Sequence, residues 1–370
     1  MLRWILFSVL GLLGAGILGL VAAMSYTSDC SPADSPGSTD GSQMLAATYS
    51  CYGPPKVVNV APADIPDIAS DEVLVKVEAA AVNPYDWHFM RGSPYFMRLM
   101  VGIGRPKDTR LGVDFAGTVM AAGEATSRFK VGDRVYGGAT GAFAELVSRR
   151  ETGSIAAIPD NVSFAQAASV PIAGITALQA LRDHGALQAG ERVLINGASG
   201  GVGTFAVQIA KSMGAHVTGV CSDRNIDMVK GIGADIVINY KTDDYTTQDE
   251  RYDLILDMVG NHSPLRNRDV LTPNGRLVII GGPSGDWLGP LARPILAAVA
   301  NLWTEQELTS MTGSMTQSDM ELLAEMMEDG RIVPVIDRHY PLAEVRDAIR
   351  YSESGRARGK IILDIAALSQ

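Results

Sequence analysis

Cysteine and histidine are scarce in this sequence, and their scarcity limits the sites that the chain can build. The three cysteines, Cys30, Cys51 and Cys221, cannot all pair with one another, and none belongs to a Cys-x-x-Cys motif. These counts exclude a framework of several disulfides and a four-cysteine zinc site. The five histidines are isolated, and none lies at ligand spacing from a cysteine or a glutamate. We therefore expect no bound metal.

Runs of basic residues are missing as well. The chain has 31 Lys and Arg against 41 Asp and Glu, which gives a formal net charge of −10. An acidic chain without a Lys/Arg-rich run binds polyanions poorly, so we expect no nucleic-acid partner. Hydrophobic residues at 46% and charged residues at 19% are typical of a globular protein. The 370 residues suffice for about two domains.

One long apolar run is present, at the amino terminus. The 21 residues from Trp4 to Met24 carry no charge, and a helix of that length can cross a bilayer. We predict an apolar anchor or signal-like segment over residues 1–24 and a flexible linker over residues 25–43, which are rich in Ser, Pro, Gly and Asp. Cleavage as a signal peptide and a translation start at Met44 remain open as alternatives.

The pattern of the remaining chain changes near Pro159. Residues 72–82 alternate as a strand does, and short apolar runs with glycine turns continue up to Pro159. Beyond it, an Ala-rich helix is expected over residues 164–181. Strand candidates at residues 192–196, 216–221, 236–238, 252–257 and 276–281 then alternate with helices, and two more strands are expected at 332–336 and 360–363. This order predicts an α/β fold, in which a doubly wound parallel sheet follows a β-rich domain.

The strongest motif is a glycine-rich turn that directly follows a predicted strand. Residues 192–203 read RVLINGASGGVG, and a helix is expected to begin within the glycines. Glycines let the backbone turn tightly and approach a pyrophosphate, while the amino terminus of a helix supplies N–H groups and partial positive charge. The motif predicts a dinucleotide site that involves Ser199, Gly200, Gly201 and Val202.

The end of the next strand distinguishes the two nicotinamide cofactors. An acidic residue there would bind the ribose 2′-hydroxyl of NAD, but the position holds Cys221. Ser222 and Arg224 follow, and a serine hydroxyl and a guanidinium can hold a phosphate. We predict NADP(H) as the cofactor, although the carboxylate of Asp223 would oppose a phosphate if it pointed inward.

A set of motifs in a fixed order resembles a known family. The chain from Met44 to its end resembles the medium-chain dehydrogenase/reductase superfamily, in its zinc-independent quinone oxidoreductase (zeta-crystallin-like) branch. Zinc-dependent relatives carry a cysteine near Asn83 and a histidine near Val113, and this chain has neither. The motifs that carry the resemblance lie at residues 44–55, 81–87, 111–117, 131–136, 196–203, 238–240 and 359–363.

The resemblance implies a domain division and a set of site residues. A GroES-like catalytic domain over residues 44–165 would be followed by an NADP-binding Rossmann domain over 166–330, and residues 331–370 would return to the first domain. The implied residues are Ser222, Arg224 and Tyr240 around the adenosine phosphate, Thr176, Asn261, Gly281 and Gly282 along the nicotinamide half, and Asn83 and Tyr95 beside the substrate.

The predicted reaction is hydride transfer from NADPH to a quinone or an α,β-unsaturated carbonyl compound. Without a metal, hydrogen bonds must polarise the acceptor, and the amide of Asn83 or the hydroxyl of Tyr95 could stabilise the developing oxyanion. Two alternatives remain open: a non-catalytic NADPH-binding protein tethered to a membrane, and a zinc-type alcohol dehydrogenase. A homodimer also remains open.

The expected location follows from the apolar segment and the cofactor together. Arg3 precedes the span and the acidic residues Asp29, Asp34 and Asp40 follow it, which weakly favours an outside domain. An NADPH enzyme needs the cytosolic pool, so we expect a single N-terminal span with a cytosolic catalytic domain. If translation starts at Met44, we expect a cytoplasmic protein.

Overall fold

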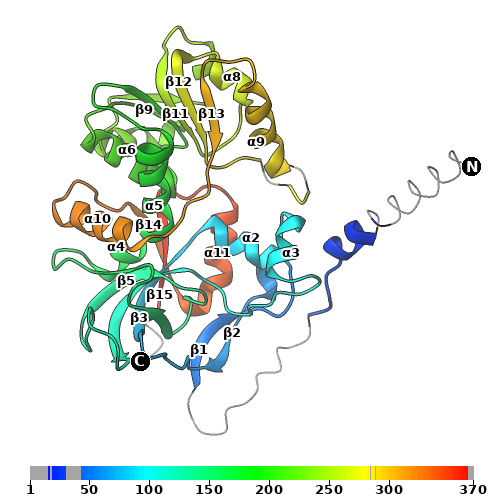
Figure 1. Ribbon diagram of the computed structural model, residues 1–370, viewed down its shortest axis with the longest axis vertical. Helices are drawn as coiled ribbons and strands as arrows, with labels where there is room; N and C mark the ends of the chain where they lie inside the picture. Colours follow the sequence, from blue (N-terminus) through cyan, green and yellow to red (C-terminus); the bar gives the residue numbers. More distant parts are fainter. Residues whose placement is uncertain (1–15, 17–18, 31–42, 284, 288, 366–370) are drawn as a thin grey trace, which may run out of the picture.

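Two sheets, one of mixed and one of parallel strands, organise the molecule (Figure 1). The computed structural model describes residues 16, 19–30, 43–283, 285–287 and 289–365. The α/β class and the β-rich first part are confirmed. In the view of Figure 1 the parallel sheet lies above the mixed sheet, and α5 and α10 lie between them.

The mixed sheet draws its strands from both ends of the chain. Its order is β14-β15-β3-β4-β5-β7, with β6 also paired to β3, while β1 and β2 form a separate antiparallel pair. The inward residues of β3 are valines and alanines, as its alternating sequence predicts. The strands are β1 (Gln43–Thr48), β2 (Asn59–Asp64), β3 (Glu72–Val82), β4 (Asp114–Ala122), β5 (Arg134–Gly138), β6 (Leu146–Arg150), β7 (Ile155–Ala157), β14 (Ile336–Pro341) and β15 (Lys360–Asp364).

The second sheet is wholly parallel, in the order β10-β9-β8-β11-β12-β13. The strand order reverses between β8 and β11, and in open α/β sheets ligands bind at the carboxyl ends of the strands at such a point. The strands are β8 (Arg192–Asn196), β9 (His216–Cys221), β10 (Ile236–Asn239), β11 (Tyr252–Asp257), β12 (Leu271–Ile279) and β13 (Glu307–Ser310).

Helices cover both sheets and connect them. Pro171 begins a new helix after α4, because proline has no backbone N–H with which to continue the hydrogen bonds of α4. The single helix predicted over residues 164–181 is instead α4, α5 and the start of a π-helical segment (Ala180–His184). The α-helices are α2 (Pro84–Arg91), α3 (Arg98–Val101), α4 (Phe164–Ala168), α5 (Pro171–Gln179), α6 (Gly201–Ser212), α7 (Ile226–Gly231), α8 (Pro264–Arg268), α9 (Gly289–Ala300), α10 (Gln317–Glu328) and α11 (Val345–Glu353).

The amino-terminal segment departs from its prediction. Much of the run from Trp4 to Met24 lies outside the described residues, and the described part is helical over residues 19–25. Within the part of the chain that the structure describes, no helix is long and apolar enough to cross a membrane. The prediction of a protein anchored by a single N-terminal span is therefore wrong.

Residues 24–30 also do not behave as a detached linker. Cys30 forms a disulfide with Cys51, and Thr27 pairs with Gly104 as a parallel β-bridge. Counting cysteines excluded a framework of several bridges, but it did not foresee this single one. Residues 31–42 of the predicted linker lie outside the described residues, and its last residue, Gln43, begins β1.

Candidate active site

The glycine turn leads from β8 into α6 with the geometry of a phosphate cradle. Gly197 has φ of 97°, in the region that favours glycine, and a Cβ on Gly203 would lie 2.1 Å from the carbonyl oxygen of Gly197. By contrast, a Cβ on Gly200 would meet only that oxygen, at 3.5 Å. Gly200 caps α6 without a side-chain hydrogen bond, so the first N–H groups of α6 remain available to an anion. The turn therefore fits a pyrophosphate group.

A polar niche lies beside this turn. The side-chain amide of Asn225 donates to the hydroxyl of Ser199 at 2.9 Å and approaches the hydroxyl of Ser222 at 3.5 Å. The Oδ1 atom of Asn225 is buried without a hydrogen-bond partner among the described residues. A buried acceptor of this kind is costly unless a ligand or water satisfies it. Asn225 is a site candidate that the sequence analysis missed, since its place next to Ser199 depends on the pairing of β8 with β9.

Charged side chains gather after the ends of β9 and β10. Asp223 forms an ion pair with Lys241 at 2.7 Å, and the hydrogen bond from Lys241 lowers the pKa of that carboxyl. The carboxylate that opposed a 2′-phosphate is thus neutralised by a lysine that the sequence analysis did not consider. Arg224 donates from Nη2 to the carbonyl oxygen of Arg356 at 2.6 Å. Tyr240 directly follows β10 and is exposed.

A buried network closes the carboxyl end of β11. Asp257 accepts from the side-chain amide of Asn196 at 2.8 Å and from the backbone N–H of Gly260 at 2.9 Å, and it forms an ion pair with Arg293 of α9. Asn196 also donates to the Oδ1 atom of Asn261 at 2.7 Å. The network therefore holds Asn261 at the point where the strand order reverses.

The other residues predicted for the nicotinamide half come from the loop after β12 and from α5. Gly281 follows β12, and a Cβ on it would lie 2.3 Å from the carbonyl oxygen of Met258, so the two strand ends approach closely. A Cβ on Gly282 would have only the side chain of Arg293 within 4 Å, at 3.6 Å and beyond. Thr176 of α5 donates its hydroxyl to the carbonyl oxygen of Ile172 at 2.7 Å, which leaves its oxygen free to accept.

On the opposite side of the turn, Asn83 belongs to a fully buried polar cluster. Its Nδ2 donates to the carbonyl oxygen of Ala81 at 3.1 Å and to Asp114 at 2.9 Å, and its Oδ1 accepts from Lys360. Lys360 also pairs with Asp114 at 3.6 Å. Because burial disfavours charge, it raises the pKa of Asp114 to about 6 and lowers the pKa of Lys360. Both amide hydrogens of Asn83 are engaged in this arrangement.

Lys360 connects that cluster to the glycine turn. The backbone N–H of Gly359 donates to the carbonyl oxygen of Ser199 at 2.9 Å, and Gly359 forms a parallel bridge with Gly200. A Cβ on Gly201 would lie 3.2 Å from Cδ of Lys360. The motif at residues 359–363 was noticed in the sequence, but only the structure gives Lys360 this place between the two sheets.

Tyr95 lies outside the Asn83 cluster, where the segment between α2 and α3 contacts the loop after β12. It begins a short 3₁₀ helix (Tyr95–Met97), and its backbone N–H donates to the carbonyl oxygen of Asp286 at 2.7 Å. Its ring meets the ring of Trp287 edge-on at 5.0 Å. Ser93 donates to the carboxylate of Asp286 at 2.7 Å. The structure thus links Tyr95 to the loop that continues from Gly281 and Gly282.

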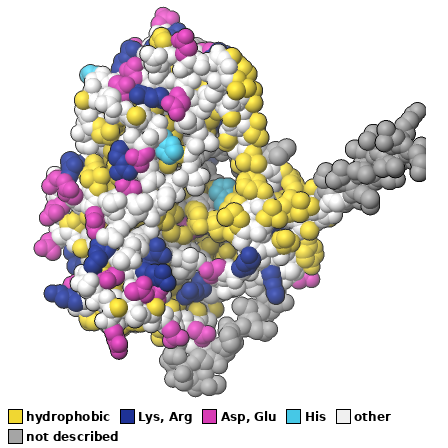
Figure 2. Space-filling view, viewed as in Figure 1, with side chains coloured by type: hydrophobic (Ala, Val, Ile, Leu, Met, Phe, Trp, Pro, Cys, Tyr) yellow, Lys and Arg dark blue, Asp and Glu magenta, His cyan; other side chains and the backbone are white. Residues whose placement is uncertain are grey.

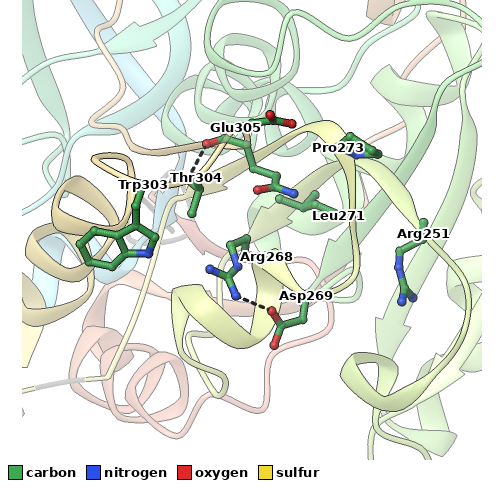
Figure 3. A pocket seen from close by; sticks show the side chains of 9 residues that line it. Arg251, Arg268, Asp269, Leu271, Pro273, Trp303, Thr304 and Glu305 are labelled. Atoms are coloured by element: carbon green, nitrogen blue, oxygen red, sulfur yellow. Dashed lines mark hydrogen bonds and ion pairs between the residues drawn. The ribbon is translucent and has the colours of Figure 1, made fainter.

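A separate hollow of about 490 Å³ lies at the other edge of the parallel sheet (Figure 3). Arg251, Leu271 and Gln306 stand at or just before the amino ends of β11, β12 and β13, and Arg268 pairs with Asp269 at 2.8 Å in its wall. Ligands of parallel sheets bind at the carboxyl ends, and none of the predicted site residues lines this hollow. We therefore take the glycine turn, and not this hollow, as the candidate active site.

Comparison with known proteins identifies the family of this chain. Residues 69–180 match the alcohol dehydrogenase GroES-like domain, and residues 232–363 match the zinc-binding dehydrogenase family. The chloroplastic quinone-oxidoreductase homolog of Spinacia oleracea is 34% identical over 338 residues, which cover 87% of this chain and 98% of that protein. A 2-methylene-furan-3-one reductase of Solanum lycopersicum is 31% identical, over 87% of this chain and 79% of its own.

A solved structure matches over the same extent. The quinone oxidoreductase of Coxiella burnetii superposes with a TM-score of 0.77 at 28% identity, covering 87% of this chain and 99% of its own. The fold, the glycine turn and these relatives define an oxidoreductase that uses a nicotinamide cofactor. The chain belongs to the medium-chain dehydrogenase/reductase superfamily, among its quinone oxidoreductases. The relatives do not favour the alternative of a non-catalytic binding protein.

Proposed function

We propose that the protein transfers hydride from NADPH to a quinone or an α,β-unsaturated carbonyl compound. The observation that carries the choice of cofactor is the pair of Asp223 with Lys241 beside Arg224, because it leaves a net positive charge where a 2′-phosphate would lie. Bound NADPH would supply the hydride. The relatives named as quinone oxidoreductase and furanone reductase support the class of acceptor.

Each part of the site has a role in this proposal. Ser222, Arg224 and Tyr240 would hold the adenosine phosphate, and the turn from Gly197 to Gly203 would hold the pyrophosphate. Thr176, Asn261, Gly281 and Gly282 would line the nicotinamide half. The proposed domain division, with boundaries at residues 44, 165 and 330, would put these residues in the Rossmann domain and Asn83 and Tyr95 in the other.

Of the two predicted catalytic residues, Tyr95 is the better donor to the acceptor oxygen. Its hydroxyl has no hydrogen-bond partner among the residues that the structure describes, whereas both amide hydrogens of Asn83 are already donated. We assign to Tyr95 a hydrogen bond to the oxygen on which negative charge develops, and to Asn83 the positioning of Lys360 and Asp114.

The surface beside this site suits an apolar acceptor. Figure 2 shows hydrophobic side chains gathered on the edge formed by α9 and by the segment from α2 to α3. Leu99 and Met100 on α3 and Ile295 on α9 are more than half exposed. A quinone or an enone with an apolar substituent could bury that substituent here and leave its carbonyl near Tyr95.

We propose that the reaction needs no metal. The cysteine near Asn83 and the histidine near Val113 that are expected of zinc-dependent relatives are both absent from this sequence. Among the described ranges, no three His, Cys, Asp or Glu side chains are grouped so that they could hold an ion.

A panel of acceptors tests this function. Purified protein is mixed with NADPH and, in separate reactions, with benzoquinones, naphthoquinones, enones and the matching saturated ketones, while NADPH oxidation is followed optically. We expect turnover of at least one quinone or enone and none of the saturated ketones. Turnover of saturated ketones alone would refute the proposed class of substrate.

A further inference from the structure

Arg98 is a buried cation without a carboxylate partner among the described residues. It begins α3, only 2% of it is exposed, and burial lowers the pKa of its guanidinium. Its charge is instead met by carbonyl oxygens: Nε donates to Gly92 at 2.8 Å and Nη2 donates to Arg91 at 3.3 Å. A buried charge is costly unless such acceptors surround it, so the elements that supply them determine where the side chain lies.

The remaining acceptors come from the amino-terminal segment. Nη1 of Arg98 donates to the carbonyl oxygens of Met24 and Tyr26, both at 2.9 Å, and to the hydroxyl of Thr27 at 3.2 Å. We call residues 24–30 the N-terminal strap; in Figure 1 it lies in dark blue beside α3. The strap is held at its far end by the disulfide from Cys30 to Cys51 and in its middle by the bridge from Thr27 to Gly104.

The guanidinium of Arg98 lies between two tyrosine rings. Its central carbon is 4.5 Å from the ring centroid of Tyr52, the neighbour of Cys51, and 4.4 Å from that of Tyr95. Tyr95 meets Trp287 with its ring and Asp286 with its backbone N–H. The ring of Tyr95 thus contacts the guanidinium of Arg98 and the ring of Trp287, and neither contact uses the hydroxyl of Tyr95.

We propose that Arg98 is a positioning residue for Tyr95 and that the N-terminal strap, fastened by the Cys30–Cys51 disulfide, keeps Arg98 in place. The proposal rests on the proposed function of Tyr95 at the acceptor. Its consequence is a redox dependence of acceptor binding. A dithiol that reduces the bridge gives two electrons and two protons to the Cys30–Cys51 bond, which yields two thiols and the cyclic disulfide of the dithiol. The strap then loses its covalent attachment.

The strap is expected to be fastened in an oxidising compartment and released in a reducing one, because disulfides persist only in the former. None of the contacts of Arg98 is to a predicted cofactor residue. Release should therefore weaken the acceptor's binding and leave that of NADPH unchanged. An effect on acceptor binding alone would distinguish a positioning role of Arg98 from a general loss of structure.

Steady-state kinetics on the full chain test the proposal with a matched pair of arginines. Arg98→Met should raise the KM for the acceptor roughly tenfold, and Arg98→Lys by less, while the KM for NADPH stays within about twofold. Arg134→Met is the control, since Arg134 is also held by carbonyl oxygens and lies over the ring of Phe164, away from the site. The control should leave both KM values unchanged.

Two further arms test the strap itself. Cys30→Ser should raise the KM for the acceptor in part, and dithiothreitol should move the wild type to the same value without affecting Cys30→Ser. If Arg98→Met does not fold, these two arms decide the question. An acceptor KM that is unchanged in folded Arg98→Met, or in both Cys30→Ser and reduced wild type, would overturn the proposal.

A last measurement separates this proposal from the proposed function. If the wild type reduces no quinone or enone, the function has failed, and hydrogen exchange of residues 92–104 with and without dithiothreitol then tests the strap alone. Faster exchange after reduction, confined to this segment and residues 24–30, would support the strap. Equal exchange in both states would reject it.

Discussion

The two sides of the proposed active site are built in different ways. Around the expected pyrophosphate, the proposed cofactor side is built from backbone: glycines without side chains, N–H groups at the start of α6, and strand ends brought together by one sheet. The substrate side consists of side chains from distant parts of the chain, such as Asn83, Asp114 and Lys360, whose polar atoms are buried and bonded to one another. We expect changes on the cofactor side to affect binding and changes on the substrate side to affect stability.

Removal of Lys360 should have the largest effect on stability. Lys360→Met leaves Asp114 buried without its cation, and loss of one partner of a buried pair costs about 3–5 kcal/mol of unfolding free energy. Urea denaturation monitored by circular dichroism measures the loss. The double variant Lys360→Met/Asp114→Asn removes both charges and should recover part of it. A loss below about 1 kcal/mol in the single variant would show that the pair contributes little.

The matching change on the cofactor side should affect affinity and spare stability. Arg224 makes its one described side-chain hydrogen bond to a carbonyl oxygen at the surface. Arg224→Ala should weaken NADPH binding by roughly 10- to 150-fold, because a charged hydrogen bond is worth about 1.5–3 kcal/mol. Fluorescence titration with NADPH and NADH measures both affinities. NADH is the internal control, and an equal loss for both cofactors would rule out a role at the 2′-phosphate.

Two glycines of the same turn should differ in their effects on stability, although both should affect NADPH binding. Gly203→Ala puts a Cβ 2.1 Å from a backbone oxygen and should cost about 1–3 kcal/mol of stability as well as NADPH affinity. Gly200→Ala meets that oxygen only at 3.5 Å, so it should cost less than about 1 kcal/mol and still weaken NADPH. Thermal unfolding and the same titration distinguish the two. Equal stability losses would contradict the assigned roles.

The difference between the two sides also explains what the sequence could predict. Strands β8, β9 and β11 have their predicted bounds, and α6 starts two residues before its predicted start, because a strand, a glycine turn and a helix are local signals. The bounds of the other strands depend on tertiary pairing. The last strand of the parallel sheet, β13, has only four residues and was missed, and the strand expected at 332–336 instead runs from Ile336 to Pro341.

The substrate side could be predicted only in part for the same reason. Asn83 and Tyr95 were named from a resemblance, but no local pattern indicates that Lys360, 277 residues further along, bonds to Asn83. Nor could spacing show that the end of the predicted apolar segment and the start of the predicted linker supply acceptors of Arg98. Contacts between residues far apart in sequence depend on the whole fold, and the polar ones among them form most of this side of the site.

Asp86 gives the substrate side a pH dependence of its own. Burial raises the pKa of this carboxyl to about 8, against the hydrogen bond from the backbone N–H of Asn83. The folded protein therefore holds a proton that the unfolded chain releases near pH 4, so stability should fall as pH rises between these values, by at most about 1.4 kcal/mol per pH unit.

Asp86→Asn should remove this slope. Urea denaturation between pH 6.5 and 8 is the suitable range, since Asp114, whose pKa is raised only to about 6, has mostly titrated below it. The asparagine keeps an oxygen that can accept from Asn83, so the start of α2 is preserved. Parallel slopes in the wild type and the variant would mean that Asp86 is ionised when buried.

Chelation should have the smallest effect, because the proposed chemistry draws on side chains and cofactor alone. The family match over residues 232–363 is described as a zinc-binding dehydrogenase, so the question is specific to this chain. Its five histidines lie at residues 88, 184, 216, 262 and 339; His88 contacts the carbonyl oxygen of Ser93, and His262 and His339 each face one aspartate. A zinc site at the acceptor would need ligands next to Tyr95, where the neighbours are Arg98, Asp286 and Trp287.

Exhaustive treatment with EDTA and 1,10-phenanthroline should therefore leave acceptor turnover unchanged, with a zinc alcohol dehydrogenase treated in parallel as the positive control. Activity that is lost on chelation and restored by zinc would show that an ion, and not the hydroxyl of Tyr95, polarises the acceptor.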